Sequence, residues 1–132
     1  ETMAIWETLP LDGEPPVVRD YAQLWRAADK VVFSRTLTAV ATAKTRLEAE
    51  FEPDAVRTLV SALPAPVSVG GATLAAEAIR AGLVDEFHRF VYPVVVGGGT
   101  PYLPQGVNLR LELLDERRFA SGVVYLHYRQ SA

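Results

Sequence analysis

The sequence predicts a mixed α/β fold with three layers, in which helices cover a mostly parallel central sheet and the last two strands form an antiparallel pair. Three observations lead to this prediction. Strand-like apolar stretches alternate with helical patterns along most of the chain, and strands separated by helices pair in parallel through crossovers. The C-terminal part has consecutive strand patterns. The length of 132 residues, 49% of them hydrophobic, predicts a single domain over residues 1–132.

The first half of the chain predicts three helices and two short strands. Residues 1–8 are typical of the end of a helix, and residues 17–28 show apolar side chains at three- and four-residue steps. The segments "KVVFSRTL", residues 30–37, and "KTRLEAEF", residues 44–51, predict strands. Proline favours the first helical turn, so a helix is expected from Pro53 to about Leu63.

The second half predicts one more helix and a series of strands. "APVSVGG", residues 65–71, predicts a strand that leads directly into a helix over residues 72–81, with Gly82 in the left-handed position after it. Residues 84–97 predict a long strand bent at Pro93. Residues 109–129 predict two antiparallel strands joined near Asp115 and Glu116.

Composition and charge exclude several classes of function. The net charge of −3 gives no electrostatic footprint for nucleic acid, and no apolar run approaches the roughly 20 residues that a membrane span requires. The absence of cysteine excludes disulfides and thiolate metal sites. These features predict a cytoplasmic protein without a nucleic-acid or membrane partner.

The glycine pair Gly70-Gly71 is the first candidate binding feature. It places bare backbone before the helix at residue 72, where the amide groups lack partners and carry the positive end of the helix dipole. A pyrophosphate could approach these amides, and Thr73 would add a hydroxyl donor. The spacing is not the three-glycine dinucleotide fingerprint, so a simple tight turn remains an alternative.

The second candidate is the tripeptide Ser34-Arg35-Thr36, which follows a predicted strand. Ligands of open α/β sheets lie beyond the carboxyl ends of the strands, where both this tripeptide and the glycine pair are expected. The planar fork of an arginine suits a phosphate, so Arg35 would fit the 2′-phosphate of a dinucleotide. A solvated turn arginine is the alternative for Arg35.

The segments "KVVFSRTL", "VSVGGATLAAEAIRAGLVDEFHRFVYPVVVGGGTPYLP" and "GVVYLHYR" together resemble the dihydrofolate-reductase-like superfamily. The resemblance is to the branch that contains the reductase domain of bifunctional riboflavin-biosynthesis proteins. It implies a twisted, mostly parallel sheet, a homodimer and an NADPH cofactor. It also implies that Ser34, Arg35 and Thr36 bind beside the 2′-phosphate, and that Gly70, Gly71, Ala72, Thr73 and Leu74 hold the pyrophosphate. A cis peptide between the two glycines is a further implication.

The implied activity is NADPH-dependent reduction of a small heterocycle, similar to 5-amino-6-(5-phosphoribosylamino)uracil. Dihydrofolate reduction and a non-catalytic nucleotide-binding or dimerisation module are the alternatives. Members of this branch begin with a strand resembling "S-L-D-G" and a later "G-R-x-T" helix start, whereas this sequence opens at "ETM". We therefore expect the N-terminal strand, the substrate loop and the unassigned catalytic residues to be missing from this sequence.

The two histidines and the three glycines at residues 97–99 give weaker indications of function. His88 and His127 are the only histidines, and they lie in separate predicted strands without the spacing of a metal site, so no metal is predicted. Gly97, Gly98 and Gly99 begin the segment "GGGTPYLP", which is expected to border the active site if it is more than a flexible surface loop.

Overall fold

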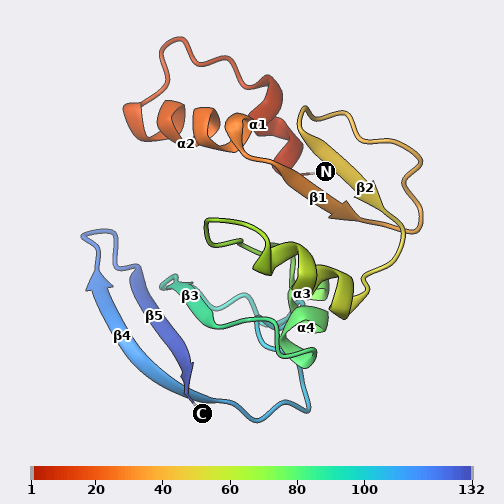
Figure 1. Cartoon of the computed structure of the whole chain (residues 1–132). Helices are drawn as coiled ribbons and strands as arrows, with labels where there is room; N and C mark the ends of the chain where they lie inside the picture. The colour runs from red at the N-terminus through yellow and green to blue at the C-terminus, as the bar shows by residue number, and fades with distance from the viewer. Residues whose placement is uncertain (1, 132) are drawn as a thin grey trace. The chain divides into compact units, whose positions relative to one another are not determined.

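The computed structural model describes residues 2–131 and shows two compact units (Figure 1). The first unit spans residues 1–51 and the second spans residues 52–132. Each unit contains both helices and strands, which confirms the mixed α/β class. The three-layer arrangement and the single domain stay predictions.

The first unit begins with two short helical segments and a longer helix. The 3₁₀ turn η1 spans Thr2–Ala4, α1 spans Ile5–Thr8 and α2 spans Pro16–Ala27. Both predicted helices are therefore confirmed, although Glu1 lies outside the described residues. Proline at the first position of α2 has the fixed φ that a helix start requires.

The first helices are joined by one ring contact and one arginine. The rings of Trp6 and Tyr21 meet edge to face, with centroids 4.7 Å apart. The half-buried Arg26 donates from Nε to the Trp6 carbonyl at 2.8 Å and from Nη2 to the Leu9 carbonyl at 2.7 Å. These bonds satisfy carbonyl groups at the end of α1 that have no partner within the helix. Ala22 of α2 is fully buried.

The two strands of the first unit pair in parallel, as Figure 1 shows. β1 spans Lys30–Phe33 and β2 spans Thr45–Glu48, and Lys30 lies opposite Thr45. Both strands are shorter than predicted. The connection over residues 34–44 contains no helix, so parallel pairing arises here without the helical crossover that the sequence pattern favours.

The helices of the second unit match the prediction closely. α3 spans Pro53–Ser61 and α4 spans Ala72–Arg80. Gly82 has a φ of +63°, and the amide of Leu83 donates to the carbonyl of Ala78 at 2.9 Å. This bond is the mark of a Schellman C-terminus, which confirms the left-handed position predicted for Gly82.

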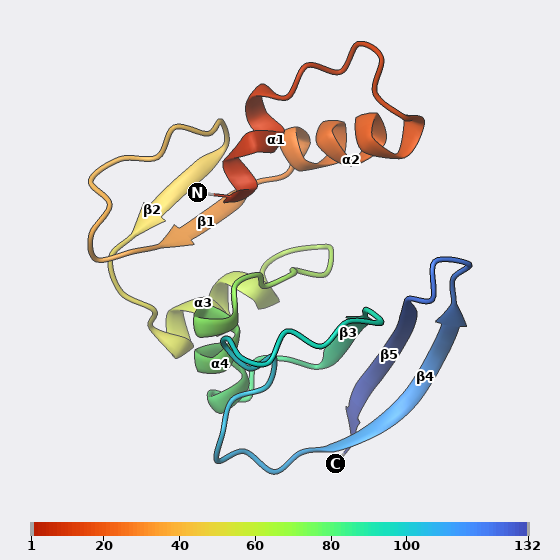
Figure 2. The ribbon, with the colours of Figure 1, turned by 180° about the vertical axis from the view of Figure 1, so that it is seen from behind.

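The second unit also contains a three-stranded antiparallel sheet with the order β3-β5-β4 (Figure 2). β3 spans Glu86–Val91, β4 spans Arg110–Arg118 and β5 spans Val124–Ser131. The antiparallel C-terminal pair is confirmed. β3 also runs antiparallel to β5, so the described strands form one parallel pair and a separate antiparallel sheet instead of one mostly parallel sheet.

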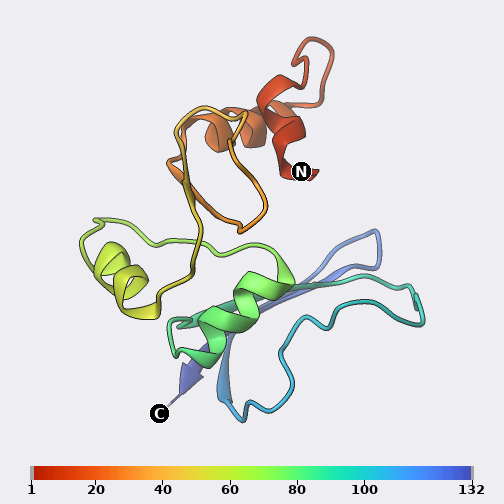
Figure 3. The same ribbon diagram turned by 90° about the vertical axis from the view of Figure 1, so that its right-hand side faces the viewer.

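The core of this unit is small and involves one face of the sheet. The buried side chains are Ala78 and Ile79 on α4, Phe87 on β3, and Val123 before β5. Figure 3 shows α4 running alongside the sheet. Because side chains alternate along a strand, the burial of Phe87 directs its neighbours on β3 to the opposite, open face.

Two apolar segments differ from the prediction. Residues 65–71 form no strand, and the predicted strand over 84–97 is paired only within β3. Val67 and Val95 are exposed. Apolar residues make a segment suitable for a sheet, but the segment becomes a strand only when a neighbouring strand supplies hydrogen bonds. The local sequence pattern does not indicate whether such a neighbour is present.

The predicted turn near Asp115 and Glu116 is also wrong. Both residues lie within β4, and the chain reverses at residues 119–123, where the Phe119 amide donates to the Val123 carbonyl at 2.9 Å. A register shift between Leu113 and Asp115 marks a bulge. The charged run suggested a turn, but charged residues are also typical of an exposed edge strand such as β4.

We expect Arg26→Met to destabilise the protein. The substitution keeps much of the apolar stem but removes both hydrogen bonds to the end of α1, so the free energy of unfolding should fall by about 1–3 kcal/mol. Urea denaturation followed by tryptophan fluorescence measures this change. Arg19→Met, on the exposed side of α2, is the matched control and should have little effect.

Candidate functional site

The first candidate site is the beginning of α4. Gly71 is the N-cap residue with φ +87° and ψ 122°, and no side chain caps the helix. The first helical bond runs from the Ala75 amide to the Gly71 carbonyl at 2.9 Å. The amides of Ala72, Thr73 and Leu74 therefore have no partner within the helix and are available to an anion.

The space around the two glycines is open. A methyl group built at Gly70 or Gly71 would meet no atom within 4 Å, and both residues are exposed. The positive φ of Gly71 explains why a glycine occupies this position. The described residues contain no cis peptide bond, so the cis bond implied between Gly70 and Gly71 is not present, and a trans peptide forms the corner.

A groove of about 320 Å³ begins at this helix terminus. From α4 it is lined by Ala72, Thr73, Ala76, Glu77 and Arg80, and from the opposite wall by Thr100, Pro101, Leu103, Pro104 and Gln105. The opposite wall belongs to the segment that follows the three glycines 97–99. The structure thus brings this segment beside the residues predicted to hold a pyrophosphate.

Tyr102 connects that segment to the sheet. Its hydroxyl donates to the His88 carbonyl at 3.3 Å, and the Arg89 guanidinium carbon lies 5.1 Å from its ring centroid. Partial burial raises the pKa of Tyr102, so the hydroxyl remains protonated and able to donate. Within the groove, Arg80 pairs with Glu77 at 2.9 Å, which compensates the negative charge of that carboxylate.

The second candidate site lies directly after β1. The half-buried Ser34 accepts hydrogen bonds at Oγ from the amides of Thr36 and Leu37, at 3.3 and 3.1 Å, which shapes a tight turn. Arg35 and Thr36 are exposed at this turn. The three residues predicted to bind the 2′-phosphate therefore share one turn in the first unit.

Arg35 is engaged by a carboxylate. Its Nη2 lies 2.6 Å from Glu50 Oε2, and its Nε donates to both carboxylate oxygens at 3.1 Å. The hydrogen bonds from Glu50, and then its charge, raise the pKa of the Arg35 guanidinium above its ordinary value. Glu50 thus holds the guanidinium in the bidentate way that a phosphate would.

The structure gathers the predicted residues into two groups. Residues 34–36 lie in the first unit, and residues 70–74 lie in the second.

The sequence interpretation treated His88 and His127 as unrelated surface residues. In the structure they face each other on β3 and β5, with ring centroids 4.1 Å apart. No local spacing could show this, because strand register joins them across 39 positions of sequence.

Residues 8–125 match the model of the RibD C-terminal domain. The chain belongs to the RibD C-terminal domain family. This confirms the resemblance to the reductase branch of the dihydrofolate-reductase-like superfamily, and membership supports a reductase-like role.

Two further proteins are similar to this chain. YyaP of Bacillus subtilis, which has no assigned activity, is 30% identical over 131 residues, a match that covers 94% of this chain and 67% of YyaP. A crystal structure of a protein from Shewanella sp. PV-4, provisionally assigned to riboflavin biosynthesis, has a TM-score of 0.69 and 18% identity. That match covers 80% of this chain and 62% of the Shewanella protein, and it shows a shared fold.

The helices give no indication of a membrane-spanning segment. Among residues 2–131, none of them combines the length and the apolar character that crossing a bilayer requires.

We expect the two glycines before α4 to respond differently to the same substitution. Gly71→Ala forces an alanine into φ +87° and should lower the free energy of unfolding by about 1–3 kcal/mol through backbone strain. Gly70→Ala has open space and no positive φ, so it should be neutral or stabilising by less than about 1 kcal/mol. Urea denaturation of both variants tests this, and equal losses would contradict the strained conformation of Gly71.

Proposed function

We propose that the protein is an NADPH-dependent reductase of a small heterocyclic substrate. The observation that carries the proposal is the uncapped N-terminus of α4, where Gly71 turns the backbone and leaves open space in front of three free amides. Membership of the RibD C-terminal domain family supports it. NADPH would supply a hydride to the substrate, and the chain would bind and orient the two molecules.

The start of α4 fits the pyrophosphate of the cofactor. Gly70 and Gly71 leave room for phosphate oxygens, and the amides of Ala72, Thr73 and Leu74 would donate to them. The exposed Thr73 hydroxyl adds one donor. The groove along α4 offers an apolar surface through Ala72, Ala76 and Leu103 against which the rest of a dinucleotide could lie.

The turn of Ser34, Arg35 and Thr36 can bind the 2′-phosphate only if Arg35 first releases the Glu50 carboxylate. Arg35 must exchange the Glu50 carboxylate for the phosphate, which presents similar paired oxygens to the guanidinium. The pair is exposed, so water stabilises Glu50 after the exchange. The competition favours the doubly charged 2′-phosphate of NADPH over the uncharged hydroxyl of NADH.

The substrate and the assembly are proposed from the family. A pyrimidine intermediate similar to 5-amino-6-(5-phosphoribosylamino)uracil is the expected substrate, and a cytoplasmic homodimer with a three-layer α/β/α arrangement is the expected form. Turnover of such a pyrimidine, measured beside dihydrofolate, distinguishes the two reductase activities. Binding of NADPH without turnover of either substrate would instead indicate a binding module.

We expect Arg35→Ala to remove the preference for NADPH over NADH. Loss of a charge-assisted contact should weaken NADPH binding by about tenfold or more and leave NADH binding nearly unchanged. Calorimetric titration with both nucleotides measures this. Arg46→Ala is the matched control, because Arg46 is also an exposed arginine of the first unit, paired with Glu48 at 2.7 Å. A preference that survives in Arg35→Ala would exclude the proposed role.

We expect Glu50→Gln to have the opposite effect. It removes the carboxylate that engages Arg35, together with its repulsion of a phosphate, so NADPH should bind several-fold more tightly while NADH is unaffected. Glu48→Gln is the control. Equal tightening of NADPH and NADH binding would show that Glu50 acts on the nucleotide by another route.

A further inference from the structure

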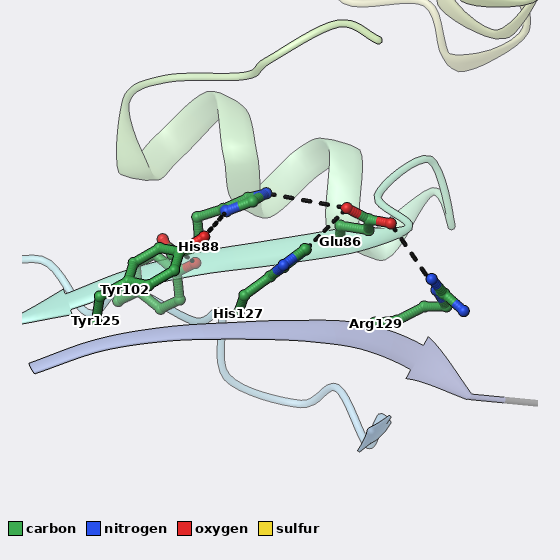
Figure 4. Close-up of polar contacts among 6 residues, drawn as sticks. All are labelled: Glu86, His88, Tyr102, Tyr125, His127 and Arg129. Atoms are coloured by element: carbon green, nitrogen blue, oxygen red, sulfur yellow. Dashed lines mark hydrogen bonds and ion pairs between the residues drawn. The ribbon is translucent and has the colours of Figure 1, made fainter. Parts of the chain in front are cut away.

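The two histidines of the chain meet on the open face of the three-stranded sheet. His88 of β3 and His127 of β5 are register partners, and their rings stack at 4.1 Å with an angle of 18° between the planes (Figure 4). The sequence has two histidines and no cysteine, so this pair concentrates all of its imidazoles at one point.

A carboxylate completes the group. Glu86 lies two residues before His88 and therefore on the same face of β3. Its Oε2 is 2.8 Å from His127 Nε2 and 4.0 Å from His88 Nε2. One ligand atom from each of the three residues lies within 4.8 Å of the others.

Tyr125 orients one of the imidazoles. Its hydroxyl lies 2.7 Å from His88 Nδ1, on the side of the ring away from Glu86, as Figure 4 shows. In the tautomer in which Nδ1 donates to this hydroxyl, Nε2 of His88 carries a lone pair directed toward Glu86. A hydrogen bond of this kind to the second ring nitrogen is typical of metal-binding histidines.

The separations of the ligand atoms are close to those around a transition-metal ion, without matching them. Zn²⁺ binds imidazole nitrogen and carboxylate oxygen at about 2.0–2.2 Å, which places tetrahedral ligand atoms about 3.3–3.5 Å apart. The observed separations from Glu86 Oε2, 2.8 and 4.0 Å, lie on either side of this value. Because nitrogen lone pairs lie in the ring planes, the stacked imidazoles must turn relative to each other to direct both lone pairs at one ion. Glu86 and His88 are exposed, so their side chains have room to move.

We propose that Glu86, His88 and His127 form a binding site for a divalent transition-metal ion, represented by Zn²⁺, with Tyr125 as a positioning residue. The two imidazoles exclude a preference for Mg²⁺ or Ca²⁺, which bind oxygen ligands. Three protein ligands leave one coordination position open to water. The ion would join β3 to β5 and thereby stabilise the sheet.

Of the charged groups around the proposed site, some oppose a bound cation and others favour it. Arg129 Nε lies 3.8 Å from Glu86 Oε1, the oxygen that the ion would not use, and opposes a cation. Asp115 is the register partner of His127 on β4, and it lines a hollow of about 510 Å³ together with His88 and Tyr125. Its carboxylate therefore adds a favourable charge to the same face.

Calorimetric titration of tag-free, chelator-treated protein with ZnCl₂ tests the proposal. We expect about one Zn²⁺ per chain and a rise in Tm with Zn²⁺ that EDTA reverses. Substitution of Co²⁺ should give the visible absorption of a tetrahedral site. An affinity weaker than about 1 mM would overturn the proposal and leave the three side chains as a hydrogen-bonded cluster.

Single substitutions test which side chains bind the metal ion. Glu86→Gln, His88→Gln and His127→Gln should each abolish the Co²⁺ spectrum, and circular dichroism should show that the two exposed substitutions and the half-buried one at His127 preserve the fold. Tyr125→Phe should weaken Zn²⁺ binding by about 10- to 100-fold without changing the stoichiometry. Glu116→Gln is the matched control, because Glu116 pairs with Leu126 on the opposite face. Binding that persists in both histidine variants would overturn the assignment.

Discussion

The second unit depends on the hydrogen bonding of β5, which pairs with β3 on one edge and with β4 on the other. This double pairing fixes which residue of each strand lies opposite which, and side-chain alternation then fixes the face. Phe87 is thereby buried while His88, the next residue, is held on the open face beside His127. A slip of one residue would exchange these positions and remove both the core contact and the polar cluster.

The two groups proposed to bind phosphate are prepared to different degrees. At α4 the binding surface is already formed, because the backbone conformation of Gly71 and the free first-turn amides exist without a ligand. At β1, Arg35 is held by Glu50 and must be released before it can bind anything else. Affinity for the pyrophosphate would therefore come from preorganised backbone, and discrimination for the 2′-phosphate from a competition between two anions.

The proposed metal site and the proposed cofactor site use different parts of the second unit. The cofactor groove follows α4 and the segment after the three glycines, whereas Glu86, His88 and His127 occupy the open face of the sheet. Tyr102 is the link, since its hydroxyl binds the backbone of His88 while its segment forms a wall of the groove. A metal that stiffened β3 would therefore also support that wall.

The sequence by itself determined the helices, the glycine corner and the family, because each is encoded in short-range periodicity, in proline and glycine positions or in local motifs. It misplaced the turn at Asp115 and expected strands over residues 65–71 and beyond Val91. Only the tertiary structure decided the register of β3 against β5, the pairing of Arg35 with Glu50 and the meeting of the two histidines. These contacts join residues distant in sequence, and their energies depend on which strand lies beside which, a property that no local pattern carries.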